Sequence, residues 1–227
     1  GIVVFNTPGA NANAVKELAG ALDEGPVVIT KSTVPVGTGD EIARILAENG
    51  APQGISVASN PEFLREGAAI ADFKRPDRIV IGADEPRAAE VISELYRPLY
   101  LNQSPLLVTG RRTAELTKYA ANAFLATKIT FINEIADLCE QVGANVQDVA
   151  RGIGLDNRIG AKFLHAGPGY GGSCFPKDTL ALIKTAQDFE APIRIGNSTS
   201  PPRPKVKASG GEPTKRSSGE APSTCRP

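Results

Sequence analysis

Short apolar runs alternate with helical patterns over roughly the first hundred residues, and this alternation constrains the fold more than any other feature. The runs are IVVF, PVVIT, ISVAS and RIVIG, each of strand length and rich in Val or Ile. Between them lie stretches such as NAVKELAGALDE and GDEIARILAENG, whose apolar residues recur at helical spacing. Strands that are apolar on both faces and alternate with helices predict a parallel sheet covered by helices on both sides.

A single long helix is predicted next, from Thr113 to Gly143. Apolar residues recur at mostly helical spacing through this stretch. Glu115 is expected in its first turn, where a carboxylate suits the helix dipole, and Gly143 is a typical C-terminal stop. Shorter helical patterns follow at NVQDVARGIG and PKDTLALIKTAQ. We therefore expect an α/β domain over residues 1–109 and an all-helical domain with one long central helix over residues 110–190.

Residues 191–227 differ from the rest of the chain in composition. They are rich in Pro, Ser, Gly and Lys and contain almost no large apolar residue. Such a segment cannot bury enough surface to offset the entropy lost on ordering. The segment is predicted to be a disordered low-complexity tail. A basic docking tail is the alternative, since it carries seven basic and two acidic residues.

Composition excludes several classes of protein. Basic and acidic residues balance at 25 each, so bulk charge does not favour a nucleic-acid partner. No run of about 18 apolar residues predicts a membrane span, and the start GIVVF does not resemble a signal peptide. The three cysteines are odd in number and far apart, which favours reduced thiols and a cytoplasmic location. No Cys or His pair has metal-ligand spacing, so no metal site is expected.

The strongest local signal for chemistry is HAGPGYGGSCFPKDTLALIKTA, which places Cys174 between a glycine-rich loop and a helix. Pro176 suits the first helical turn because its missing N–H would be unpaired there in any case. The positive end of the helix dipole favours the nucleophilic thiolate, and Lys177 adds positive charge. Asp178 lies within reach of the thiol. The alternative is a small buried hydrophobe, which is the role expected for Cys139 in the long helix.

A second candidate site is ASNPEFLREGAAI, which follows a predicted strand. Asn60 is expected to cap a helix that carries Glu62 and Glu66 on one face, beyond the carboxyl end of the strand, where open α/β sheets bind ligands. The N–H groups of Phe63 and Leu64 at the start of that helix are expected to suit a phosphate. A capped surface helix with solvated acids is the alternative.

Two further stretches carry polar residues at positions suited to ligand binding. In ITKSTVPVGTGD, the hydroxyl of Thr33 at the end of a strand either touches a cofactor or caps a turn. In the long helix, Lys118 and Asn122 lie one turn apart on one face. They could stabilise an oxyanion, or they could be a lysine that reaches solvent and an amide that bonds a neighbouring helix.

The order of these segments resembles the UDP-glucose/GDP-mannose dehydrogenase family. KSTVPVGTGD, SNPEFLREG, KYAANAFLATKITFINEIADLCE and GPGYGGSCFPKD occur in the family's order and approximate spacing, over roughly residues 1–190. The tripeptide NTP near the start also matches a loop of the family's nucleotide domain. Phe175 after the cysteine is more similar to the UDP-glucose enzymes than to the GDP-mannose branch.

The resemblance implies an oxidoreductase with a Rossmann-like NAD-binding domain and a helical dimerisation domain. Family members oxidise the C6 alcohol of a nucleotide sugar to a carboxylate with two NAD molecules, through a cysteine thiohemiacetal and thioester. UDP-glucose is the implied substrate, and a homodimer through the central helix is the implied assembly. Arg158 is expected to reach the neighbouring subunit's substrate.

The resemblance also assigns roles to particular residues. The implied catalytic residues are Cys174, Lys118, Asn122, Asp178, Glu62 and Thr33. The implied NAD contacts are Thr7, Thr33, Glu66 and Lys177. The implied substrate contacts are Glu62, Phe63, Leu64, Arg65, Glu66, Lys118, Asn122, Arg158, Phe163, Leu164, His165, Ala166, Gly167 and Gly171.

The chain departs from the family pattern at both ends. The family begins with a strand and a G-x-G-x-x-G turn that binds the NAD pyrophosphate, and this sequence has no such turn. The low-complexity tail stands where the family has a domain that grips the uridine. We therefore expect a fragment with an incomplete Rossmann-like sheet. Three alternatives stay open: a GDP-mannose or other sister specificity, a non-catalytic dimerising fragment, and a cysteine hydrolase with His165 as its base.

Overall fold

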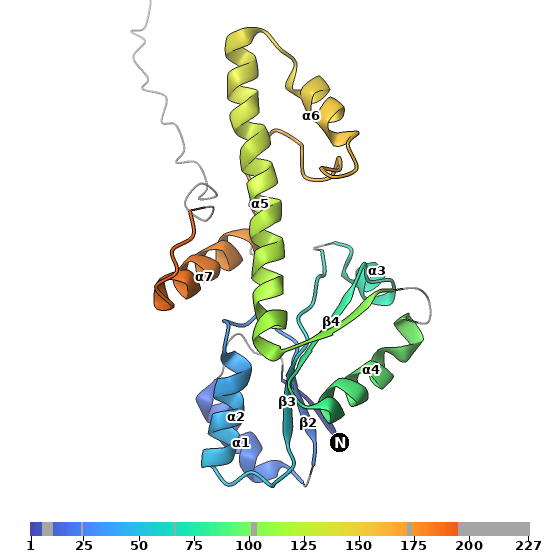
Figure 1. The fold of residues 1–227 in the computed structure, drawn as a ribbon, viewed down its shortest axis with the longest axis vertical. Coiled ribbons are helices and arrows are strands. Elements are labelled where there is room, and N and C mark those ends of the chain that lie inside the picture. Colours follow the sequence, from blue (N-terminus) through green and yellow to red (C-terminus); the bar gives the residue numbers. More distant parts are fainter. Residues whose placement is uncertain (6–10, 24, 66, 101–103, 172–173, 195–227) are drawn as a thin grey trace, which may run out of the picture.

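A five-stranded sheet lies between helices at one end of the molecule, and one long helix rises from it, as the computed structural model shows (Figure 1). The structure describes residues 1–5, 11–23, 25–65, 67–100, 104–171 and 174–194. The tail predicted for residues 191–227 lies almost entirely outside the described residues. No helix in the described ranges is long and apolar enough to cross a membrane.

The sheet has the strand order β1-β2-β3-β4-β5. Three neighbouring pairs are parallel, but β3 and β4 run antiparallel and share only two residue pairs. The mixed α/β fold is confirmed, whereas the expectation of an entirely parallel sheet is wrong at this one pair. The strands are β1 (Ile2–Phe5), β2 (Val27–Thr30), β3 (Ser56–Ser59), β4 (Ile79–Ala83) and β5 (Leu106–Thr109).

The connection between β3 and β4 explains the antiparallel pair. Its helix α3 (Ala69–Lys74) has six residues and buries none of them, so it does not pack across the sheet as a parallel crossover requires. The chain instead enters β4 from the side on which β3 ends. Residues 60–65 and 67–78 therefore remain at the carboxyl ends of the parallel strands, which is the edge where α/β sheets bind ligands.

The helix expected to start at Pro61 does not form, and residues 61–65 are irregular. Asp72 accepts hydrogen bonds from the backbone N–H and the guanidinium of Arg65, which hold the segment in a loop. Gly67, at a φ of +79°, adopts a left-handed conformation that breaks a helix. Glu62 therefore lies on a loop and not on a capped helix face.

Helices cover both faces of the sheet because its strands are apolar on both faces. The helices α1 (Ala12–Ala21) and α2 (Thr38–Glu48) pack on one face, and α4 (Pro86–Tyr100) packs on the other (Figure 1). In β2, Val28 belongs to the first core whereas Val27 and Ile29 belong to the second, as the alternation of side chains along a strand requires.

The long helix α5 runs from Arg111 to Val142 over 32 residues. It begins two residues earlier than expected, so Glu115 lies beyond its first turn. Gly143, at a φ of +72°, ends it as expected. The helix α7 (Cys174–Asp188) packs beside α5, and α6 (Val146–Gly154) packs near its far end around a small core of Ile132, Ala150 and Leu164. The division into domains at residues 109 and 110 falls between β5 and α5 and stays a prediction.

The contact between β4 and α5 requires a glycine. A Cβ at Gly82 would lie 2.5 Å from the Cβ of Ala114 and 2.9 Å from the Cα of Arg111. Both distances are far below van der Waals contact, and neither backbone can move freely. Gly82 therefore allows α5 to start directly against the sheet.

We expect Gly82→Ala to lower the free energy of unfolding by about 1–3 kcal/mol, because the methyl group overpacks this contact. Gly20→Ala is the matched control, since Gly20 lies in α1 and a methyl group added there would meet nothing within 4 Å. Urea unfolding followed by circular dichroism measures both. Equal stability of the two variants would contradict the proposed close approach.

Candidate active site

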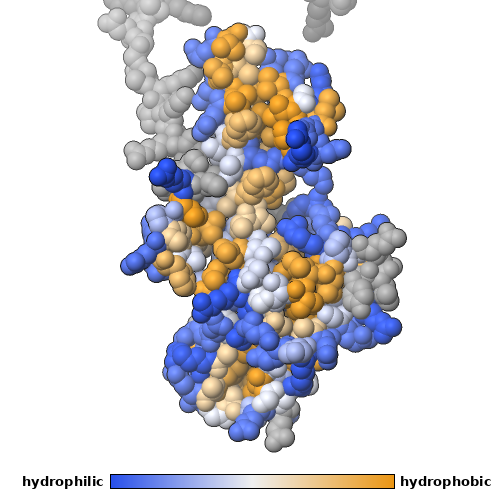
Figure 2. Space-filling model, in the orientation of Figure 1, coloured by the Kyte–Doolittle hydropathy of each residue, from blue (hydrophilic) through white to orange (hydrophobic). Residues whose placement is uncertain are grey.

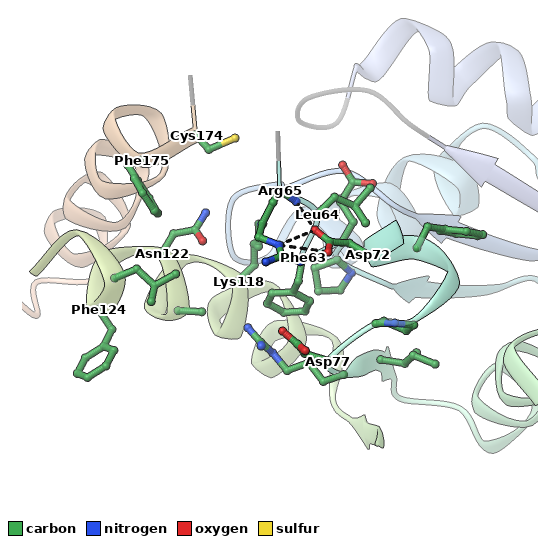
Figure 3. A pocket seen from close by; sticks show the side chains of 18 of the residues that line it. Phe63, Leu64, Arg65, Asp72, Asp77, Lys118, Asn122, Phe124, Cys174 and Phe175 are labelled. Carbon is green, nitrogen blue, oxygen red and sulfur yellow. Dashed lines mark hydrogen bonds and ion pairs between the residues drawn. The ribbon is translucent and has the colours of Figure 1, made fainter. Parts of the chain in front are cut away.

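A pocket of about 630 Å³ opens between the carboxyl edge of the sheet and the middle of α5. Residues of the loop after β3 line one side, and residues of α5 and the start of α7 line the other (Figure 3). Among the described residues, its wall contains six basic side chains and three acidic ones, so it suits an anionic ligand. The charged lining residues are Lys31, Arg65, Arg78, Lys118, Lys128, Lys162, Glu62, Asp72 and Asp77.

Cys174 is the first residue of α7 and lines the pocket with an exposed thiol (Figure 3). Its position at a helix N-terminus agrees with the sequence pattern, although Gly172 and Ser173 before it lie outside the described residues. Phe175 follows it into the pocket wall and makes edge-to-face contacts with Phe163 and Tyr170. The aromatic contacts fix the start of α7 against the loop that precedes it.

Lys118 and Asn122 reach the same pocket from α5, and both are buried (Figure 3). The Asn122 Nδ2 atom donates a hydrogen bond of 2.6 Å to Asp178 Oδ2 on α7. Asp178 is 1% exposed, and its Oδ1 atom accepts no hydrogen bond from the described residues. The Asn122 amide keeps a second N–H, and Asp178 keeps one acceptor oxygen.

Burial lowers the pKa of Lys118 from its ordinary value. The negative charges of Asp178, Cys174 and Glu62 oppose this shift, whereas the Arg78 guanidinium adds to it. The Lys118 ammonium also lies 5.2 Å from the centroid of the Phe63 ring. A lysine whose two protonation states are brought closer in energy is suited to donate and accept protons.

The loop after β3 supplies Glu62, Phe63, Leu64 and Arg65 to the pocket wall. Glu62 and Arg65 are exposed, and the other two are half-buried. The Asp72 carboxylate accepts hydrogen bonds from the guanidinium and the backbone N–H of Arg65, which lower the pKa of Asp72 to about 2. The expected helix N-terminus for a phosphate is therefore absent from residues 61–65, and Arg65 contributes charge from within an ion pair.

A second polar cluster at the pocket was not assigned a role from the sequence. Lys31 Nζ donates to Asn60 Oδ1 at 3.0 Å and to Tyr96 OH at 2.8 Å. Tyr96 OH donates to Asn60 Oδ1, and Asn60 Nδ2 donates to the carbonyl of Val80. Asn60, expected to be a helix cap, is instead buried and ties the loop to β4. A lysine directly after a buried strand was the signal available in the sequence.

Arg78, Lys128 and Lys162 also line the pocket without having been expected there. The Arg78 guanidinium carbon lies 3.9 Å from the centroid of the Phe63 ring. Lys128 on α5 donates to the carbonyls of Ile159 and Gly160, which anchors the loop after α6. Their positions depend on long-range packing, and only Arg78, the basic first residue of RIVIG, offered a local signal.

Several residues expected at the site lie elsewhere. Thr33 is half-buried in the loop between β2 and α2 and does not line the pocket, and Lys177 lies on α7, likewise outside the pocket wall. Thr7 and Glu66 lie outside the described residues. Arg158 is exposed and paired with Asp156.

In the run from Phe163 to Gly167, only Phe163 lines the pocket, and it does so with a φ of +66°. Leu164 is buried in the core beside α6, and His165 is exposed. Ala166 packs against that same core, and Gly167 N donates to Asn133 Oδ1. Gly171 lines the pocket as expected.

Two family models match the chain. Residues 9–100 match the NAD binding domain of the UDP-glucose/GDP-mannose dehydrogenase family, and residues 112–200 match its central domain. Curated relatives include the UDP-glucose 6-dehydrogenase of Rhizobium meliloti, 72% identical over 82% of this chain. The UDP-glucose 6-dehydrogenase of Pseudomonas aeruginosa is 53% identical over 77% of the chain.

A solved structure of a UDP-glucose dehydrogenase from Pyrobaculum islandicum has the same arrangement of elements. It superposes with a TM-score of 0.79 and 42% identity over 87% of this chain. The chain spans 43% and 40% of the two curated relatives and 48% of the solved chain.

We expect Asp178→Asn to lower the pKa of Lys118 further, because the neutral amide removes a charge that favours the ammonium. Competitive acetylation at a series of pH values, with the Lys118 peptide quantified by mass spectrometry, measures the midpoint. Asp188→Asn is the matched control, since it removes a carboxylate of α7 that pairs with Lys184. A Lys118 midpoint that stays constant or rises in Asp178→Asn would contradict the electrostatic effect of Asp178 on Lys118.

Proposed function

Because the chain belongs to the UDP-glucose/GDP-mannose dehydrogenase family, we propose that its pocket oxidises the C6 hydroxyl of UDP-glucose to the carboxylate of UDP-glucuronate. The observation that carries the proposal is the convergence of Cys174, Lys118 and Asn122 on one pocket, with Asp178 directly behind the amide. The curated relatives at 72% and 53% identity bear the name of this activity, which favours UDP-glucose over GDP-mannose.

The carboxyl ends of β1, β2 and β3 are the proposed binding site for NAD. The loop after β2 lies at that edge and contains the half-buried Thr33, whose hydroxyl is able to bond a carboxamide. Thr33 and Lys177 are the described residues proposed to hold it, together with Thr7 and Glu66. When bound, NAD accepts one hydride in each of the two oxidations.

The thiolate of Cys174 is proposed to act after the alcohol has become an aldehyde. Its sulfur adds to the C6 carbon, and the carbonyl oxygen becomes the oxyanion of a thiohemiacetal. Loss of the second hydride from C6 leaves a thioester. Water then adds to the thioester carbon, the C–S bond breaks, and the carboxylate leaves while the thiolate is restored.

Lys118, Asn122 and Asp178 are proposed to manage charge and protons in these steps. The Lys118 ammonium and the second N–H of Asn122 face the same pocket as the thiol, so both can stabilise an oxyanion on C6. The Oδ1 acceptor of Asp178, to which no described residue donates, suits a water molecule whose proton must be removed. Glu62, exposed at the pocket, offers a second route for that proton.

We expect the chain, incubated with NAD and UDP-glucose, to form two NADH per sugar, measured by absorbance. Cys174→Ala should lower this rate on the order of 10³-fold or more, because the covalent route is lost. Cys225→Ala is the matched cysteine control and should keep the parent rate.

A Cys174→Ala rate equal to that of the parent would contradict the covalent route. Absence of NADH from the parent chain would contradict the activity and favour a non-catalytic dimerising fragment. Faster turnover of GDP-mannose or UDP-N-acetylmannosamine would contradict the assigned substrate.

A homodimer through α5 is proposed from the exposed apolar face of that helix. Phe124, Phe131 and Leu138 follow one another at seven-residue intervals and are all exposed. Figure 2 shows apolar side chains gathered toward the far end of α5 and over α6. Arg158 lies on an exposed loop after α6, so it is proposed to reach the partner's pocket. A cytoplasmic location is proposed as well, because Cys139 and Cys174 are free cysteines, and free cysteines are typical of reducing compartments.

We expect Phe131→Glu to shift the chain from dimer to monomer in sedimentation velocity, because a carboxylate would be buried at the helix contact. Leu95→Glu is the matched control, since Leu95 is also an exposed apolar residue but lies on α4. A parent chain that sediments as a monomer at micromolar concentration, or equal behaviour of the two variants, would contradict the α5 interface.

A further inference from the structure

We propose that Glu115 is a positioning residue whose buried carboxylate holds three segments in one arrangement. They are the loop of residues 31–37 (the Thr33 loop), the loop of residues 60–65 (the Glu62 loop) and the face of α5 that carries Lys118 and Asn122. The role rests on the proposed function, because the three segments carry side chains assigned to that reaction. Glu115 itself does not line the pocket.

The carboxylate of Glu115 is 2% exposed and accepts three hydrogen bonds from two distant segments. Gly37 N donates to Oε2 at 2.7 Å, and Gly39 N donates to Oε1 at 2.9 Å. Ser59 Oγ donates to Oε1 at 2.8 Å. The two amide donors belong to the N-terminus of α2, so the carboxylate also lies at the positive end of that helix.

Each of these contacts fixes one end of a segment that leads to the pocket. Gly37 ends the loop that contains Thr33. Ser59 is the last residue of β3 and directly precedes the loop that carries Glu62. Glu115 lies about one helical turn before Lys118 and about two turns before Asn122 on α5. A shift of the carboxylate would therefore move the three segments relative to one another.

Two glycines beside Glu115 leave the space that its carboxylate occupies. A Cβ at Gly39 would lie 3.1 Å from Glu115 Oε1 and 3.2 Å from Ser59 Oγ. Gly37 has a φ of +94°, which residues other than glycine rarely adopt. Burial raises the pKa of Glu115, whereas the two amides and the Ser59 hydroxyl oppose that rise. The donors thus compensate a carboxylate that water does not reach.

A neighbouring pair of salt bridges on α5 contacts other segments. The Arg111 guanidinium on the first turn of α5 pairs with Asp40 and Asp84 and donates to the Val57 carbonyl at 3.4 Å. These contacts attach the start of α5 to α2, to the middle of β3 and to the end of β4. They involve neither the Thr33 loop nor the last residue of β3. Among the described residues, the Glu115 side chain therefore bonds both the end of the Thr33 loop and the residue before the Glu62 loop.

The test measures whether Glu115 places Lys118 beside Cys174. The rate of Cys174 alkylation by iodoacetamide is determined at pH 7 from the Cys174 peptide, without NAD or sugar. The four proteins of the cycle are the full parent chain, Lys118→Gln, Glu115→Gln and the double variant. Because the charges of Lys118 and Cys174 attract each other, Lys118→Gln should slow alkylation about threefold in the parent background.

In the Glu115→Gln background we expect Lys118→Gln to have almost no further effect, because α5 no longer holds the ammonium beside the thiol. Glu140→Gln is the matched control, an exposed acid on the same helix, and should keep the full effect of Lys118→Gln. Ser59→Ala removes one of the three hydrogen bonds and should give an intermediate effect. It keeps the test available if Glu115→Gln does not fold.

An equal slowing by Lys118→Gln in the parent, Glu115→Gln and Ser59→Ala backgrounds would show that Glu115 contributes only to stability and would overturn the proposal. No slowing in the parent background would also overturn it, because Lys118 would then not be held beside Cys174. Neither result depends on turnover, so a chain that forms no NADH would contradict the proposed activity while leaving this test decisive.

Discussion

A buried carboxylate at position 115 is the contact on which the arrangement of the molecule depends. An ionised group removed from water is costly unless its oxygens accept hydrogen bonds from fixed donors. Here two backbone amides and a hydroxyl provide them, from positions 78, 76 and 56 residues away in the sequence. Because those donors lie at the ends of two loops, the carboxylate holds both loops against the start of the long helix. Gly82 and Gly39 leave the space that this approach requires.

The antiparallel pairing of β3 with β4 gives the pocket its second wall. A parallel crossover would have carried residues 60–78 over the face of the sheet, away from the strand ends. The unburied six-residue α3 cannot make such a crossover, so the whole connection stays where ligands bind. Asn60 then ties the loop to β4 and to Lys31, and Asp72 holds the loop open through Arg65. The irregular loop is thus fixed by side chains instead of by helical hydrogen bonds.

Local periodicity was sufficient to predict four of the five strands and the long helix, because β-branched runs and helical spacing act over a few residues. The strand β5 was not predicted. The local pattern was sufficient to predict Cys174 at the start of α7 as well, since a glycine-rich loop, a proline and a helical pattern follow one another there. The prediction of a helix starting at Pro61 is wrong, because Gly67 breaks the helix and Asp72 bonds Arg65 in a loop. Three features depend on residues that are far apart in sequence. They are the orientation of β4, the hydrogen bonds to Glu115 and the Lys31–Tyr96 contact. Such contacts leave no local pattern, so only the folded chain reveals them.

The proposed chemistry reduces to whether the sulfur at the start of α7 becomes bonded to the sugar carbon that is oxidised. Acid quenching during turnover of UDP-glucose with NAD, followed by mass analysis of the Cys174 peptide, observes this bond directly. We expect a UDP-hexuronyl thioester on that peptide, and hydroxylamine should remove it. NADH formation with an unmodified Cys174 peptide at every time point would contradict it.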